Sequence, residues 1–187
     1  MNDDFRHDLR EMTRSDHDRV DHALSALDLA QAQDFVRFLR IHRMAFGAMV
    51  PLCKTGSATR EILTDICARI DDDLATLGAA PVAGAADVEL AAVDPLAIDY
   101  MLEGSRLGSK VLRMQWARTS SAAVRRAARY FDTPAPVERW RAVCGALSAI
   151  PTDSLRAARI VRDTRRLFAL FEVAQAAASR QPMPKAV

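Results

Sequence analysis

Two glycines and a histidine are the residues of this chain whose types and spacing point most directly to chemistry. Gly104 and Gly108 lie one helical turn apart within residues 101–112, where the apolar residues follow a helical period. A glycine inside a helix costs roughly 1 kcal/mol relative to alanine. A pair on one face therefore indicates that something approaches the backbone closely. A second helix that offers an imidazole could then hold a flat, iron-centred ligand between the two.

Four histidines are available to supply that imidazole, and none of them belongs to a zinc-type motif. The chain has neither an HExxH sequence nor a pair of cysteines two residues apart. An iron ligand needs an acceptor for its second ring nitrogen. His17 has Asp21 one turn later, and His22 has Asp18 one turn earlier, so the acid partner alone does not decide between them. A lone helical histidine is also commonly a surface or core residue.

Composition favours one helical domain. The chain has 187 residues, half of them hydrophobic, with few aromatics and only seven glycines. A net charge of +2 argues against a nucleic-acid binder, and no apolar run is long enough to suggest a membrane span. Cys53, Cys67 and Cys144 are unpaired in spacing, and the acidic first residues do not resemble a secretory signal. We therefore expect a cytoplasmic protein.

Periodicity and breakers predict seven helices in a single all-α domain over residues 1–178, followed by a flexible tail over 179–187. The helices are expected at about residues 5–27, 31–53, 59–77, 94–118, 120–131, 137–150 and 154–178. Asp3 or Asp4 caps the first and Thr59 the third, which Gly78 ends. Asp94 and Pro95 suit the start of the fourth. Trp116, Trp140 and Met114 are expected in the core.

Two segments resemble the haem oxygenase family. Residues 9–21, LREMTRSDHDRVD, resemble its first helix, where Leu-Arg or Leu-Lys is followed by Thr, by His four residues later and by an acid four further on. Residues 103–109, EGSRLGS, resemble its distal helix, especially in the bacterial, biliverdin-producing branch. The order and separation of the motifs also match, with weaker similarity over 31–53 and 154–178. The resemblance implies a single-domain, haem-oxygenase-like helical bundle.

On the proximal side, the resemblance makes His17 the iron ligand. Asp21 is then expected to hold its ring, and Thr13 lies one turn before it. Arg10 and Arg14 precede His17 on nearby turns and are expected to meet the haem propionates. The family also uses basic residues of the last helix there, and Phe168 and Phe171 are expected as pocket wall or core. The basic candidates are Arg159, Arg162, Arg165 and Arg166, of which Arg162 and Arg166 enter our predicted site.

On the distal side, Gly104 and Gly108 are expected to let the helix bend over the haem. Ser105 faces the same space, where it can join a water network. Ser109 stands where the family often has glycine or alanine, and Asp21 is shorter than the more usual glutamate. These two departures leave open a relative that binds haem or a protein partner without turning haem over.

The implied activity uses haem as both cofactor and substrate, which O2 and electrons convert to biliverdin, Fe²⁺ and CO. No GxGxxG motif is present, so the electrons are expected from a ferredoxin or a flavoprotein reductase. A bacteriophytochrome that accepts biliverdin is a candidate partner. A histidine phosphotransfer domain is an alternative outside this family, but the residues after His17 and His22 lack the sequence that such a domain usually has there. The individual motifs also have purely structural alternatives. The glycines would then merely permit helix packing, and the arginines would form a solvated face.

Overall fold

The computed structural model describes residues 4–82, 92–133 and 137–181 of the chain. Within these ranges the secondary structure is α-helical, with one 3₁₀ turn and no strand. The eight α-helices are α1 (Phe5–Met12), α2 (Arg14–Ser25), α3 (Ala32–Met49), α4 (Ala58–Thr76), α5 (Pro95–Trp116), α6 (Ala122–Arg126), α7 (Val137–Ser148) and α8 (Leu155–Arg180), and the 3₁₀ turn η1 (Val50–Leu52) follows α3. The all-α class predicted from the sequence is confirmed for these residues.

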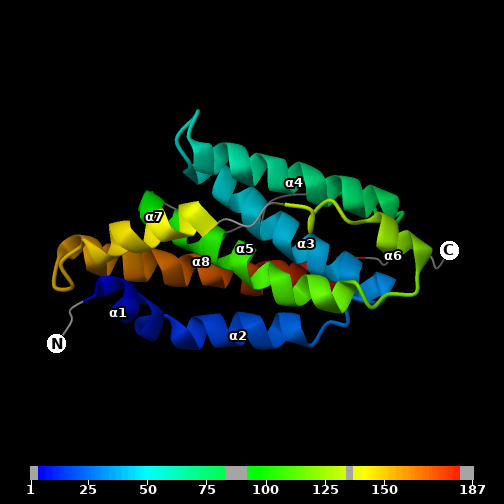
Figure 1. The fold of residues 1–187 in the computed structure, drawn as a ribbon, viewed down its shortest axis with the longest axis horizontal. Helices are drawn as coiled ribbons and strands as arrows, with labels where there is room; N and C mark the ends of the chain where they lie inside the picture. The colour runs from blue at the N-terminus through cyan, green and yellow to red at the C-terminus, as the bar shows by residue number, and fades with distance from the viewer. Residues whose placement is uncertain (1–3, 83–91, 134–136, 182–187) are drawn as a thin grey trace.

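The long helix α8 is the element around which the others are placed (Figure 1). α3 packs between α8 and α4, while α2 and α5 each pack against α8, and α7 covers the first half of α5. In Figure 1, α2, α5 and α8 run in the same direction and α3 runs in the opposite one. Some seventy residues of the chain separate α2 from α5, yet both helices pack against α8 and run in the same direction.

The core is a single apolar cluster that centres on α3 and α8. Phe35, Phe38 and Phe46 of α3 are fully buried, and Phe171 of α8 packs edge-on against Phe46. His42 lies inside this aromatic cluster, where its Nδ1 makes a 2.9 Å hydrogen bond to the carbonyl of Phe38. Burial lowers the pKa of His42 to about 4. This histidine is therefore a neutral core residue that is remote from solvent.

The first predicted helix is two helices. The interpretation of residues 5–27 as one continuous helix was wrong, because the helix breaks at Thr13. Thr13 has φ −109° and ψ 6°, and its buried hydroxyl donates to the carbonyl of Leu9 at 2.7 Å. A threonine hydroxyl that bonds the carbonyl four residues back competes with the regular helix and bends it. The break turns α2 away from the axis of α1.

Most of the expected helix ends are confirmed. Asp4, Asp94 and Ser121 accept backbone hydrogen bonds as N-caps, and Gly78 ends α4 with φ +66°. Thr59 is not the cap of α4, because Ser57 accepts from Arg60 N. Asp3 lies outside the described residues.

The predicted helix over 120–131 was too long, since α6 ends at Arg126. The chain from there bends back to α4, where the buried carboxylate of Asp73 accepts from the backbone amides of Arg129 at 3.0 Å and Tyr130 at 2.8 Å. Tertiary hydrogen bonds thus replace the helical ones. The expected loop over 79–93, the break at 132–136 and the tail over 179–187 fall partly outside the described residues. None of the described helices combines the length and apolar character that crossing a bilayer would need.

Candidate functional site

The helix that carries His17 contributes no buried side chain to the protein. Every residue of α2 is exposed or only partly buried, and Val20 and Leu24 touch the edge of the core. Two polar contacts connect it to α8: Arg19 Nε donates to Glu172 at 2.8 Å, and Arg165 Nε lies 3.6 Å from the carboxylate of Asp16. Such a helix leaves a wide polar face and its histidine available.

His17 is exposed over 63% of its side chain and lies at the boundary between α2 and α8. Its ring meets Phe168 of α8 edge to face, with the ring centroids 5.9 Å apart. Phe168 is buried, so it provides a fixed wall for the imidazole. Phe168, which the sequence analysis expected as pocket wall or core, thus lies beside His17.

The expected contact between His17 and Asp21 is absent. His17 Nδ1 lies 3.5 Å from a carboxylate oxygen of Asp18 instead, and both groups are exposed. At this distance the interaction is weak. Thr13 also departs from the prediction, because its hydroxyl is turned inward to Leu9. Asp21 is exposed and makes no hydrogen bond to another described residue.

The two glycines of α5 differ in their surroundings. A Cβ on Gly104 would lie 3.7 Å from the ring of Trp140 on α7, whereas one on Gly108 would meet nothing within 4 Å. Gly104 is therefore covered by α7 at an ordinary contact distance that would also accommodate the Cβ of alanine. Gly108 faces open space. The expected approach of a ligand to the backbone has room at Gly108, whereas Trp140 covers Gly104.

The second half of α5 exposes apolar side chains. Leu107, Val111 and Met114 are exposed by 36%, 58% and 56%, so Met114 is not the core residue that the sequence indicated. Gly108 and Val111 lie on one stripe of the helix, which continues to Gln115. Three exposed apolar residues within two turns form a surface that suits an apolar ligand or partner.

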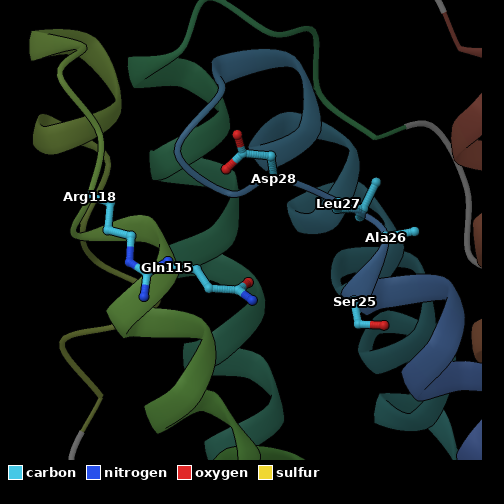
Figure 2. Close-up of a pocket in the computed structure, with 6 residues that line it drawn as sticks. All are labelled: Ser25, Ala26, Leu27, Asp28, Gln115 and Arg118. Carbon is cyan, nitrogen blue, oxygen red and sulfur yellow. The ribbon is translucent and has the colours of Figure 1, made fainter.

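A cavity of about 260 Å³ separates the ends of α2 and α5. Its lining residues are Ser25, Ala26, Leu27, Asp28, Gln115 and Arg118. Figure 2 shows Gln115 reaching from α5 toward the last turn of α2, with Ser25 and Ala26 across the gap. The Oε1 atom of Gln115 is buried and has no hydrogen-bond partner within the described residues.

The residues that line this cavity show which turns of α2 and α5 lie opposite each other. Ser25 and Gln115 line the same cavity, and α2 and α5 run in the same direction (Figure 1). A step of two turns toward the N-terminus from each of these residues therefore leads to comparable positions on the two helices. From Ser25 that step, roughly 12 Å, reaches His17, and from Gln115 it reaches Gly108 after roughly 10 Å. His17 and Gly108 therefore lie at similar levels on the two helices that border the cavity.

The predicted propionate ligands have different partners. Arg162 and Arg166 both pair with the buried carboxylate of Asp163, at 3.0 and 3.6 Å, and that carboxylate also accepts the backbone amide of Asp94 at 2.9 Å. Arg14 is paired with Glu11. Arg162 and Arg166 thus take part in the polar contact between α8 and the start of α5.

Two of the other arginine candidates remain open to an anion. Arg10 and Arg159 make no hydrogen bond or ion pair within the described residues, and both are exposed. The charge of Arg10 acts on Tyr100 of α5, where it opposes the larger effect of burial, which raises the pKa of that phenol. Arg10, on α1, therefore lies near Tyr100 in the first turns of α5.

Sequence reasoning missed a buried charge network beside the glycines. Glu103 is fully buried and accepts hydrogen bonds from Arg139 Nε at 2.5 Å and Arg106 Nη1 at 2.6 Å. Its position directly before Gly104 was visible, but its burial depends on α7, which lies far along the chain. Ser105 makes no hydrogen bond to a described residue, and Ser109 donates to the carbonyl of Arg106 at 2.6 Å.

The chain matches no protein-family model and no curated protein. The site is therefore judged by its chemistry. Within the described residues no three His, Cys, Asp or Glu side chains gather to hold a metal ion, so His17 would act as a single protein ligand. A single imidazole, an open glycine and exposed apolar side chains suit haem, whose four ring nitrogens already hold the iron.

Proposed function

We propose that this protein binds haem between α2 and α5 and cleaves it as a haem oxygenase. One observation supports the proposal above the others: His17 is exposed beside Phe168, at the level where Gly108 leaves α5 without a side chain. An imidazole on one helix and bare backbone on the facing helix are the two requirements for a flat, iron-centred ligand with one free face. The resemblance of residues 9–21 and 103–109 to the family supports the same assignment.

The residues of the chain divide the work between the two faces. His17 supplies a neutral imidazole nitrogen, and Phe168 limits the rotation of its ring. Leu107 and Val111 cover apolar parts of the ligand and exclude water from it. The unbonded hydroxyl of Ser105 is available to order water near Gly104. Arg10 offers a cation to a propionate.

Bound haem would supply the iron that activates oxygen and would itself be the substrate, opened to biliverdin with release of Fe²⁺ and CO. Electrons must then come from a separate ferredoxin or flavoprotein reductase. A bacteriophytochrome remains a candidate acceptor of the biliverdin, and the cytoplasm remains the expected location.

The test is a titration of the purified protein with hemin, followed by addition of a reductant in air. A Soret band that decays into the broad red absorption of biliverdin would support the oxygenase. A Soret band that persists after reduction would instead support the alternative of a haem-binding relative without turnover. The absence of any Soret band would overturn both assignments.

A further inference from the structure

The first half of α5 is held by two adjacent residues of α7. Arg139 Nε donates to the buried carboxylate of Glu103 at 2.5 Å, and the ring of Trp140 lies where a Cβ of Gly104 would be in contact. Trp140 also packs against Tyr100, with ring centroids 5.6 Å apart. α7 therefore contacts α5 where the glycine segment, residues 104–108, begins.

The same arginine connects α7 to a third helix. Arg139 Nη2 lies 3.3 Å from the hydroxyl of Thr59 on α4 and 3.6 Å from the carboxylate of Asp99 on α5. Thr59 in turn donates to Asp99 at 2.5 Å. A planar guanidinium can serve both Glu103 and Asp99 at once, which a lysine ammonium cannot do with the same geometry.

A buried carboxylate is a strong constraint on the helix that carries it. Glu103 has no exposed side-chain surface, so loss of Arg139 would leave its buried charge compensated by Arg106 alone. Beyond Glu103, α5 has lost its buried residues: those that follow are at most partly buried. Residues 104–108 therefore lie between the anchor at Glu103 and a second one near the end of α5, where Arg113 donates to the carbonyl of Phe131 and Trp116 Nε1 to the carbonyl of Val124, both at 3.1 Å.

We propose that Arg139 is a positioning residue that acts through Glu103 to set where residues 104–108 lie over the haem. The inference rests on the proposed function for the identity of the ligand. The role of Arg139 itself concerns the geometry of α5 and can be measured without haem.

The experiment compares Arg139→Met with Arg141→Met, a matched change on α7. Arg141 is exposed and makes no hydrogen bond or ion pair within the described residues. Amide hydrogen exchange in the protein without haem should accelerate on the order of tenfold over residues 104–108 in Arg139→Met, and remain unchanged in Arg141→Met. Arg139→Lys should give an intermediate rate. Equal exchange in the two methionine variants would overturn the proposal.

A turnover assay provides a second test of the role of Arg139. In the presence of hemin and reductant, Arg139→Met should change the ratio of biliverdin isomers, because the ring would be presented differently to α5. An unchanged ratio would overturn the positioning role even where the rate falls. If the natural chain does not convert haem, the proposed function fails and the exchange result alone decides the role of Arg139. Should Arg139→Met not fold, Arg139→Lys against Arg141→Lys provides the same comparison.

Discussion

The ring of His17 on α2 and the ring of Phe168 on α8 meet at 85°, with their centroids 5.9 Å apart. The edge-to-face arrangement is a favourable geometry for two aromatic rings. It orients an exposed imidazole by contact with a buried residue of another helix. The orienting group that the sequence indicated, a carboxylate one turn away, is replaced by an aromatic wall.

His17→Ala should remove the iron ligand and leave the fold intact, since this side chain is largely exposed. We expect hemin affinity to fall by on the order of tenfold or more and the Soret band to shift. Added imidazole should restore the spectrum if the space left by the side chain admits it. His22→Ala is the matched control on the same helix, and an equal loss in both variants would contradict the assignment.

Gly108→Leu should have opposite effects on folding and on binding. Nothing lies within 4 Å of a Cβ at this position, and leucine is a better helix former by about 1 kcal/mol. We expect the melting temperature to stay equal or rise while hemin affinity falls. Gly104→Ala, whose Cβ meets Trp140 at an ordinary contact distance, is the control. Normal hemin binding by Gly108→Leu would show that α5 does not cover the ligand.

The arginines can be ranked by their present partners. Arg162 is occupied by Asp163, whereas Arg10 has no ion pair within the described residues. Arg10→Gln should therefore weaken hemin binding by about two- to fivefold, the range expected for an exposed ion pair, and Arg162→Gln by less than about twofold. The difference should shrink at high salt. A larger loss in Arg162→Gln, measured by the same titration, would restore the assignment made from the sequence.

The stability of the protein should fall on the acid side because of His42. Its pKa is about 4 in the fold against an ordinary value of 6.5, so the unfolded chain binds the proton first as the pH drops. The contribution is complete above pH 6.5 and is lost as the pH falls toward 4. The free energy of unfolding should decrease by about 2 kcal/mol from pH 7 to 5, and by about 3 kcal/mol at pH 4, from this group alone.

Urea unfolding of the protein and of His42→Phe at each pH isolates this term. Phenylalanine suits the aromatic surroundings of Phe38, Phe46 and Phe171 but does not titrate. Carboxylates contribute equally to both proteins, so the difference between the two curves reports His42. Parallel curves would mean that the pKa of His42 is the same in the folded and unfolded chains.

Local signals predicted the fold where a helix end is decided by its own residues. Asp94 before Pro95 and Gly78 with its positive φ are such cases. The sequence was misleading where another hydrogen bond competes with those of the helix. At Thr13 that bond is local, from the side-chain hydroxyl to the carbonyl of Leu9, and the helix breaks there. The segment after Arg126 leaves the helical path because the carboxylate of Asp73, over fifty residues earlier, bonds its amides.

The candidate site could be predicted from residue types but not from their partners. His17 and Gly108 were found because imidazoles and interior glycines are rare and conspicuous. Gly104 carries the same sequence signal as Gly108, and only the placement of Trp140 separates their roles. The arginines of α8 could not be ranked, because their availability depends on the burial of Asp163 rather than on spacing.

The absence of buried side chains on α2 has a consequence for the lifetime of the protein. A helix that meets the core only through the partly buried Val20 and Leu24 can detach while the core remains closed, and such segments open at low free energy. A ligand coordinated by His17 would hold α2 to the rest of the molecule, adding about 2.7 kcal/mol at one hundred times its dissociation constant. Protease resistance of the N-terminal segment would then report the supply of haem, and the protein would persist longest while its substrate is present.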